Sequence, residues 1–215
     1  MSFDKKSYVS GENPWKDIPL SDYENHMSLD SVQQLQMMNR AMKEQFDLYP
    51  VSSAMVLGIA GGNGLEHVDP NKYRKVYGVD INPLYLQETE QRYQDLEGTL
   101  ECLCLDLISD ADRLPPADLL IANLLVEYIG YGVFQEAVKT VSPAYVSCII
   151  QINEGEGFVS DSPYLNVFDR LDEVHHQMEE EDLTKALEEV GYQKAASADY
   201  PLPNGKKLVR LDFRK

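Results

Sequence analysis

Short apolar runs alternate along the chain with longer amphipathic stretches. The runs have the length of buried strands and lie at 54–59, 76–80, 100–105, 117–122 and 145–152. In other stretches, apolar residues recur at three- and four-residue spacing, which predicts helices over 32–48, 84–96 and 133–141. Strands that alternate with helices predict a parallel sheet that is covered on both faces.

The end of the chain breaks this alternation. A stripe of Leu183, Ala186, Leu187 and Val190 predicts a last helix, and Gly191 follows it where a helix-terminating glycine belongs. Two further strands are predicted at 192–200 and 207–213, and the Pro-Leu-Pro-Asn-Gly between them indicates an antiparallel hairpin. The predicted fold class is therefore α/β, with a doubly wound, mostly parallel, seven-stranded, Rossmann-like sheet, a C-terminal antiparallel hairpin and an N-terminal helical cap.

Residues 1–50 are predicted to form the N-terminal arm and cap helix, and residues 51–215 the sheet domain. Residues 1–27 are polar and irregular, which indicates an extended arm. The helix that follows has Ser28 or Asp30 available as its N-cap.

Tyr23, His26 and Met27 cluster just before this helix. Two interpretations stay open for them. They form the edge of a lid that packs on the core, or they close over a bound ligand. A polar segment at 153–163, with Gly155 and Gly157, predicts a mobile loop at the carboxyl edge of the sheet, where ligands usually bind.

The first predicted strand ends in the glycine-rich sequence Gly58-Ile-Ala-Gly-Gly-Asn-Gly64, and the second ends at Asp80. Glycines let backbone N–H groups approach a bulky ligand, because no Cβ stands in the way. An acid at the end of the next strand accepts hydrogen bonds from ribose hydroxyls. Asp80 follows Gly64 by sixteen residues, near the spacing of about 20 in nucleotide-binding units. Together the two features predict half of a nucleotide-cofactor site.

The third and fourth predicted strands also end in polar residues, Asp106 and Asn123. Right-handed crossovers bring the ends of parallel strands to one edge of a sheet, so we expect these residues beside Gly61–Gly64 and Asp80. Only Leu65–Val68 follows the glycines before Asp-Pro, so the next helix is very short. A dinucleotide needs a longer helix to present its dipole to the pyrophosphate. S-adenosylmethionine has a ribose and an adenine but no phosphates, and it needs that dipole less.

With these positions the chain resembles the class I S-adenosylmethionine-dependent methyltransferase family, from about Val51 to the C-terminus. Four segments are similar to the first four motifs of that family: Val56–Gly64, Gly-Val-Asp80-Ile-Asn-Pro, Leu-Asp106-Leu and Asp118–Leu125. The closing helix and hairpin are also similar to the end of the family's sheet, and domains that bind nicotinamide cofactors lack this feature. The resemblance implies a methyltransferase domain over residues 51–215 and S-adenosyl-L-methionine as its cofactor.

The resemblance also implies roles for single residues. The backbone of Gly58–Gly64 would line the amino acid tail and the sulfonium, Asp80 would hold the ribose diol, and Asp106 would accept a hydrogen bond from the adenine amino group. Ile81 and Leu107 would sandwich the adenine, and Asn123 and Leu124 would border the reactive methyl group. The implied cofactor-binding residues are Gly58, Ala60, Gly61, Gly62, Asn63, Gly64, Asp80, Ile81, Asp106, Leu107, Asn123 and Leu124.

The chain departs from the family at two positions, because Gly58 stands where an acid is usual and Ala60 where the first glycine is usual. Loss of the acid leaves open how the cofactor's ammonium group is held. Three alternatives therefore remain beside a small-molecule methyltransferase. These are a degenerate module that binds the cofactor without transferring the methyl group, a nicotinamide-dependent oxidoreductase, and a methyltransferase for protein side chains.

Methyl transfer is an in-line displacement in which positioning supplies much of the catalysis. A base is needed only if the nucleophile must lose a proton. The candidate catalytic residues are Glu127, Tyr128 and His26, and Tyr23 and His26 are also the candidates for substrate binding. Methyltransferases of nucleobase amines carry Pro-Pro-Tyr/Phe after an Asn or Asp, whereas Leu-Leu-Val follows Asn123 here. We therefore expect a small-molecule substrate that is methylated on O or N.

Composition narrows the partners further. The formal net charge of -17 argues against nucleic acid, and the only dense group of Lys and Arg is in the last ten residues. No charged-then-apolar leader and no apolar run long enough to span a membrane is visible, so a cytoplasmic protein without a membrane partner is predicted. Cys102, Cys104 and Cys148 lie in apolar runs without the spacing of metal ligands, so we expect buried, reduced cysteines and no metal site. The oligomeric state stays open.

Overall fold

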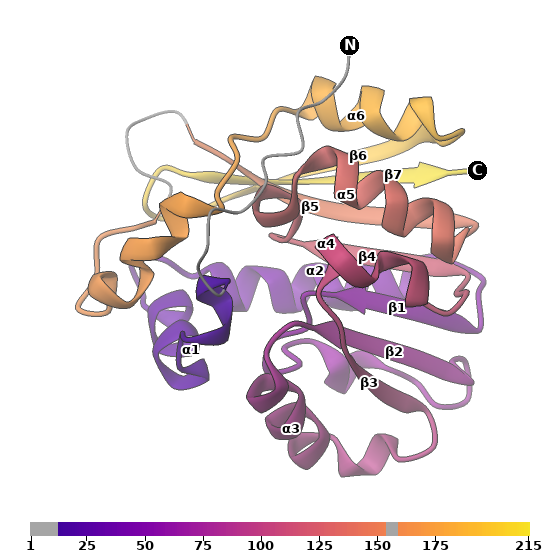
Figure 1. Cartoon of the computed structure of the whole chain (residues 1–215), viewed down its shortest axis with the longest axis horizontal. Helices are drawn as coiled ribbons and strands as arrows, with labels where there is room; N and C mark the ends of the chain where they lie inside the picture. Colours follow the sequence, from indigo (N-terminus) through magenta and orange to yellow (C-terminus); the bar gives the residue numbers. More distant parts are fainter. Residues whose placement is uncertain (1–12, 154–158) are drawn as a thin grey trace.

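The structure is a computed structural model that describes residues 13–153 and 159–215. Its strands are β1 (Ser53–Leu57), β2 (Lys75–Asp80), β3 (Leu100–Cys104), β4 (Leu119–Asn123), β5 (Tyr145–Ile152), β6 (Gln193–Pro201) and β7 (Lys207–Arg214). They form one sheet in the order β3-β2-β1-β4-β5-β7-β6, in which β1 to β5 are parallel and β7 is antiparallel to β5 and β6 (Figure 1). The predicted mostly parallel sheet with a C-terminal hairpin is confirmed. The first twelve residues of the predicted arm lie outside the described residues, as do Gly155 and Gly157 of the predicted loop.

Helices cover both faces of the sheet (Figure 1). The α-helices are α1 (Leu20–Ser28), α2 (Gln34–Leu48), α3 (Pro83–Arg92), α4 (Leu107–Asp110), α5 (Val126–Val141) and α6 (Glu180–Glu189). Single turns or short runs of 3-10 helix are η1 (Pro14–Lys16), η2 (Leu65–His67), η3 (Gln94–Leu96), η4 (Ala111–Arg113) and η5 (Leu165–Glu173). The short element after the glycines, η2, confirms the prediction made from the early Asp-Pro.

Successive residues of β1 pack on opposite faces of the sheet, as the pleat requires. Ala54 and Val56 pack in one core cluster with Phe46 of α2. Met55 and Leu57 pack in the other with Phe134 of α5. Each large buried side chain contributes roughly 1.5–3 kcal/mol, so both layers of helices are held firmly. The loops at the carboxyl ends of the strands thereby receive a rigid frame.

The N-terminal segment differs from the predicted extended arm, because residues 20–28 form helix α1. Pro19 precedes this helix and no side chain caps it, so no local signal marks its start. The helix is held instead by tertiary contacts, with Met27 packed against Met38 and Ala41 of α2.

The predicted caps of α2 are wrong. This helix begins at Gln34 after Gln33, whose φ of 51° places it in the left-handed region, and no side chain caps the helix. Ser28 Oγ donates to the carbonyl of Asn25 instead. The Gln34 amide reaches across to the side chain of Gln151, so a contact with the end of β5 holds the first turn.

Helix α5 starts earlier than the predicted stripe at 133–141. It begins at Val126 and is broken at Gly130, which has φ 73° and ψ 163°. A glycine tolerates this conformation without steric cost. The break leaves one turn after β4, and that turn carries Glu127 and Tyr128.

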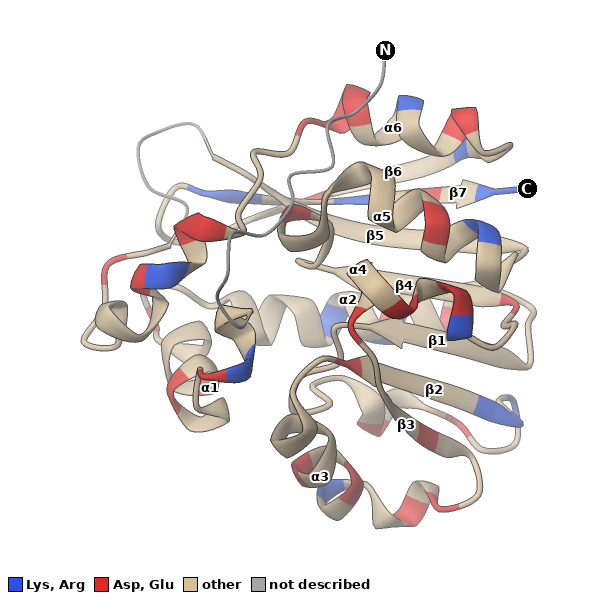
Figure 2. Ribbon diagram, in the orientation of Figure 1, with Lys and Arg blue, Asp and Glu red and all other residues tan. Residues whose placement is uncertain are grey.

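Charges are spread over the surface, and Figure 2 shows acidic and basic residues interspersed on most elements. Two members of the C-terminal basic group are paired: Lys207 lies 3.2 Å from Asp199, and Arg210 lies 2.6 Å from Glu44. The prediction for the cysteines holds in part. All three are free, but only Cys148 is fully buried and Cys104 is exposed.

Candidate functional site

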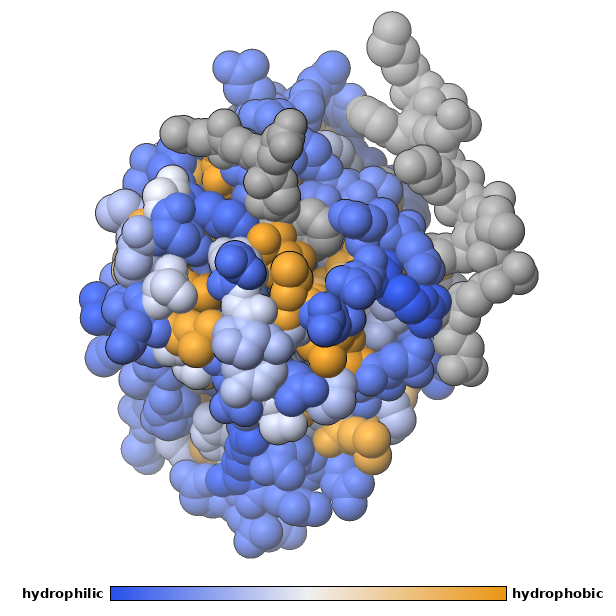
Figure 3. Space-filling view, turned by 90° about the vertical axis from the view of Figure 1, so that its left-hand side faces the viewer, coloured by the Kyte–Doolittle hydropathy of each residue, from blue (hydrophilic) through white to orange (hydrophobic). Residues whose placement is uncertain are grey.

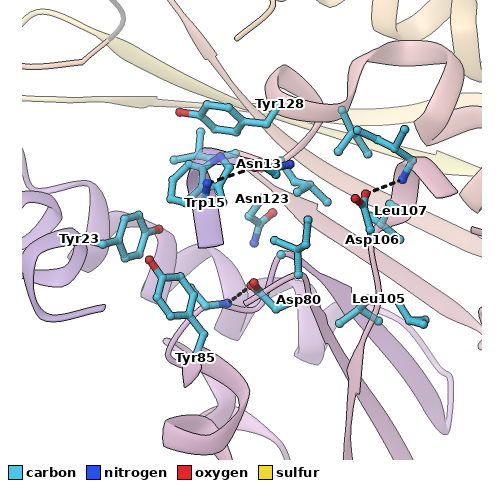
Figure 4. A pocket seen from close by; sticks show the side chains of 18 residues that line it. Asn13, Trp15, Tyr23, Asp80, Tyr85, Leu105, Asp106, Leu107, Asn123 and Tyr128 are labelled. Carbon is cyan, nitrogen blue, oxygen red and sulfur yellow. Dashed lines mark hydrogen bonds between the residues drawn. The ribbon is translucent and has the colours of Figure 1, made fainter. Parts of the chain in front are cut away.

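A cavity lies at the carboxyl ends of β1, β2, β3 and β4, under η1 and α1, and is called here the strand-end cavity. Figure 4 shows Asp80, Asp106 and Asn123 around it, with Trp15, Tyr23 and Tyr85 approaching from the N-terminal segment and α3. The predicted site residues in its wall are Gly58, Ala60, Asp80, Ile81, Asp106, Leu107, Asn123, Leu124, Tyr23 and Tyr128. The ends of four strands therefore meet in one cavity.

Asp80 is held in place by the backbone. Its Oδ2 accepts a hydrogen bond from the N–H of Ala60 (2.9 Å), and its Oδ1 accepts one from the N–H of Asn82 (2.9 Å). Burial raises the pKa of this carboxyl, and the backbone N–H groups of Asn82 and Ala60 oppose that effect. Three backbone N–H groups, of Asn82, Ala60 and Ile81, hydrogen-bond to the carboxylate, which has about four acceptor sites, so Asp80 can still accept from a ligand.

Asp106 has a structural task as well, because its Oδ1 accepts from the N–H of Ile108 (3.0 Å) and caps α4. The flanking Ile81 and Leu107 also line the cavity, and Leu107 is buried. An acid beside two branched apolar side chains fits the edge and faces of a heteroaromatic ring.

The glycine stretch divides between two environments. Gly58 and Ala60 line the cavity. Gly58 has φ 69°, a conformation that residues with a side chain rarely adopt, and an added Cβ would lie in tight contact with Leu125, 3.0 Å from its Cδ1. A side chain is therefore disfavoured there. This is a physical reason for the missing acid.

Gly61, Gly62, Asn63 and Gly64 are not in the wall of the cavity, in contrast to the expectation from the motif. An added Cβ on Gly61 would meet Glu24 of α1 at 2.4 Å, and one on Gly64 would meet Met42 of α2 at 2.5 Å. The side chain of Asn63 donates to the carbonyl of Leu35 (2.9 Å). These residues let the cap helices approach the turn closely, and this packing turns them away from the cavity.

Asn123 is oriented by a buried partner that the sequence did not reveal. Gln45 Nε2 donates to Asn123 Oδ1 (3.0 Å), and Asn123 Nδ2 donates to Gln45 Oε1 (2.9 Å). Gln45 is fully buried and also donates to Ser147 Oγ (2.8 Å). Gln45 lies within the apolar stripe of α2. A glutamine at a core position of a helix was the one feature of the sequence that could have indicated a buried polar contact.

Hydrogen bonds from α3 and its N-cap tie the N-terminal segment over the cavity. Asn82 Nδ2 donates to the carbonyl of Trp15 (3.0 Å), and Tyr85 Oη donates to the carbonyl of Ile18 (2.9 Å). The Trp15 ring packs edge-on against Tyr128, with centroids 4.9 Å apart. Trp15 was not predicted as a site residue. The one feature of the sequence that could have pointed to it was the presence of a large aromatic side chain in an otherwise polar segment.

A second cavity, called here the side chamber, shares Trp15, Tyr23, Leu124 and Tyr128 with the strand-end cavity. His26, Glu127 and Phe168 complete much of its wall. His26 is buried, its Nδ1 hydrogen-bonds with Ser162 Oγ (2.7 Å), and its ring packs against Phe168. The candidate substrate-binding residues Tyr23 and His26 therefore line one chamber.

Glu127 is 4 % exposed, and its Oε2 has no hydrogen-bond partner among the residues that the structure describes. Burial raises its pKa to about 8. Burial, together with the charge of Lys206, lowers the pKa of His26. Burial also holds the phenol pKa of Tyr128 well above its ordinary value, so Tyr128 is a hydrogen-bond donor at neutral pH. At neutral pH most Glu127 side chains hold a proton and His26 is neutral. His26, and Glu127 once it is ionised, are therefore the members of the candidate set that can accept a proton.

Within residues 13–153 and 159–215, no group of three His, Cys, Asp or Glu side chains is placed to hold a metal ion. No helix among these residues is both long and apolar enough to cross a bilayer.

No family model matches the chain, and no curated protein matches it. Solved structures do. The magnesium protoporphyrin IX methyltransferase of Synechocystis with bound S-adenosylhomocysteine (SAH) is 13% identical, with a TM-score of 0.64 over 91% of this chain and 93% of that one. The N-methyltransferase NodS of Bradyrhizobium japonicum with bound SAH is 14% identical, with a TM-score of 0.62 over 91% of this chain and 97% of that one. The [4+2]-cyclase SpnF is 13% identical, with a TM-score of 0.63 over 86% of this chain and 82% of that one. The chain has the Rossmann-like fold of the class I S-adenosylmethionine-dependent methyltransferases.

Proposed function

We propose that the protein is an S-adenosylmethionine-dependent methyltransferase that acts on a small molecule at O or N. The observation that carries this proposal is the wall shared by the two cavities. Leu124 and Tyr128 line both the strand-end cavity and the side chamber. A donor in one cavity and an acceptor in the other would meet there, as an in-line transfer requires.

The strand-end cavity fits this cofactor better than one with phosphates. No Lys or Arg is among the described residues that line it, whereas Asp80 and Asp106 are. The element after the glycines is a single 3-10 turn, which has little dipole to offer a pyrophosphate. Acidic and neutral walls suit the cationic sulfonium and the adenosine of S-adenosylmethionine. They do not suit the negatively charged pyrophosphate of a nicotinamide dinucleotide.

When bound, S-adenosylmethionine supplies a methyl group that its sulfonium activates. Asp80 would accept hydrogen bonds from the ribose hydroxyls through the free lone pairs of its oxygens, and Asp106 would accept from the adenine amino group between Ile81 and Leu107. Asn123, fixed by Gln45, would border the reacting centre. Trp15 and Tyr128 would exclude water, and Glu127 or His26 would take the proton that the acceptor loses.

Calorimetric titration with SAH tests the cofactor site. The wild type is expected to bind, and Asp80→Asn is expected to bind at least about 100-fold more weakly, because a charged acceptor contributes roughly 1.5–3 kcal/mol for each hydrogen bond. Asp80→Ala should abolish binding. Asp112→Asn removes an exposed acid on η4 and should bind like the wild type.

Circular dichroism establishes that each variant is folded. Unchanged affinity in folded Asp80→Asn, or no binding by the wild type, would reject the site. Turnover of labelled cofactor with a metabolite mixture then separates an enzyme from a module that only binds.

A further inference from the structure

The side chamber contains a buried carboxyl group that faces no Lys or Arg side chain in the described wall. Glu127 lies on the first turn of α5, is 4 % exposed and lines the chamber. Its Oε2 has no hydrogen-bond partner among the described residues. The backbone N–H groups of Glu127 and Gln151 favour the ionised form, but burial outweighs them. A buried carboxylate without a counter-charge is costly, and the free Oε2 leaves a place for a complementary group.

Apart from Glu127, the described wall combines aromatic rings and imidazoles with aliphatic side chains, the amides of Gln34 and Gln151 and the hydroxyl of Ser160, and it carries no Lys or Arg side chain. Trp15, Tyr23, Tyr128 and Phe168 line it, and Trp15 packs edge-on against both tyrosines. Aromatic faces attract cations and amines. Figure 3 shows this end of the molecule, where hydrophobic residues gather near the middle of the face within hydrophilic surroundings.

The other titratable groups of the chamber do not supply a positive charge at neutral pH. Burial lowers the pKa of both His26 and His175, and the charge of Lys206 lowers them further. Lys206 is not in the described wall, and burial lowers its own pKa to about 8. The chamber thus combines one acid, aromatic rings and neutral imidazoles.

We propose that the side chamber takes a small primary or secondary amine, that Glu127 binds its ammonium group, and that the amine nitrogen is the methyl acceptor. This inference rests on the proposed function. The ammonium first gives a proton to the Glu127 carboxylate. The nitrogen lone pair then forms the N–C bond, and the S–C bond electrons leave with sulfur, which becomes a neutral thioether. The product is the methylated ammonium, and the proton on Glu127 passes to water.

The same chemistry disfavours the other acceptors. A carboxylate or phosphate acceptor would face Glu127 with no cation in the described wall to balance two negative charges. An alcohol would leave the carboxylate without a counter-charge. An amine brings the missing charge and the missing hydrogen-bond donors together.

Trp15 provides a direct test, because it is the only tryptophan of the chain and lines the chamber. Its fluorescence is measured during titration with a panel of alkyl and aryl amines and with the alcohols of the same carbon skeletons, such as phenethylamine and phenethyl alcohol. In the wild type saturated with SAH, at least one amine is expected to give a saturable change with at least tenfold higher affinity than its alcohol. Glu127→Gln keeps the shape of the side chain and is expected to remove that preference.

Two further variants make the test specific. Glu127→Asp withdraws the carboxylate by one methylene and should weaken the preference for amines without abolishing it, and this readout remains if Glu127→Gln does not fold. Ser162→Ala removes the partner of His26 and should keep the preference.

Equal binding of amines and alcohols, an amine preference that survives in Glu127→Gln, or no saturable response to any amine would overturn the inference. The affinity for SAH, measured by calorimetry, should be the same in the wild type and in Glu127→Gln. Failure of the wild type to bind SAH would instead reject the proposed function, and the amine titration without SAH would still report on the chamber.

Discussion

The two adjoining cavities differ in how their polar groups are satisfied. In the strand-end cavity, Asp80, Asp106 and Asn123 all have protein partners, namely backbone N–H groups or the side chain of Gln45. In the side chamber, Glu127 Oε2 has none among the described residues, and neither has the indole N–H of Trp15, which lines both cavities. The first cavity is thus held in shape by the protein itself. The second has polar groups that a ligand would complete.

The largest expected effect is on the pH dependence of stability, through Glu127. Its pKa is about 8 in the folded protein, against an ordinary value of 4.5. Between these values the folded state keeps a proton that the unfolded state has lost. The contribution of Glu127 to stability is therefore full below about pH 4.5 and is lost as pH rises toward 8, by up to roughly 1.4 kcal/mol per pH unit.

Glu127→Gln should remove this loss. The free energy of unfolding by urea, measured from pH 5 to 9 for both proteins, gives a difference curve in which groups common to both cancel. We expect the wild type to lose stability relative to the variant as pH rises. A flat difference curve would show that Glu127 is ionised without cost, and the contrast between the two cavities would disappear.

The contrast also explains which parts of the site the sequence predicted. Asp80, Asp106 and Asn123 each follow an apolar run directly, and the topology of parallel strands brings such residues to one edge whatever the rest of the chain does. The local sequence pattern and the general rule for connecting parallel strands were enough to predict that these three residues lie close together. Gly61–Gly64 were assigned to the same cavity, because a motif does not show that α1 and α2 would pack against that turn.

The side chamber could be predicted only in part, because it is assembled from separate segments by packing. Tyr23, His26, Glu127 and Tyr128 were candidates from their positions beside the arm and the fourth strand. Phe168 lies in η5, a 3-10 segment that was not predicted, and its contact with His26 joins residues 142 positions apart. Helix α1 was missed for a similar reason, since it has no cap and is held by its contacts with α2.

A smaller effect is expected on the partnered side, at Gln45. Gln45→Leu keeps the size of the side chain but leaves Asn123 and Ser147 without their shared partner in a fully buried place. Buried polar groups without partners cost roughly 1–3 kcal/mol, so thermal and urea unfolding should show a loss of about 2 kcal/mol. Gln36→Leu alters a more exposed position of the same helix and should cost less than about 1 kcal/mol. Equal stability of the two variants would mean that Asn123 is oriented by other contacts.

The smallest effect is expected at Asn82, which holds the backbone of Trp15, a residue of the wall shared by the two cavities. Its Oδ1 caps α3 by accepting from the N–H of Leu84 (3.0 Å), and its Nδ2 ties down the carbonyl of Trp15 (3.0 Å). Asn82→Ser keeps a capping oxygen but loses the hydrogen bond to the carbonyl of Trp15, and Asn82→Ala loses both.

The alanine variant should therefore be about 1 kcal/mol less stable than the serine variant in urea unfolding. The two variants should share the same red shift of Trp15 emission, because the tryptophan becomes more exposed to water in both. If Trp15 emission in both variants equals that of the wild type, other contacts, such as the hydrogen bond from Tyr85 to Ile18, hold the N-terminal segment over the cavity. The wall shared by the two cavities would then be as firmly held as the strand ends.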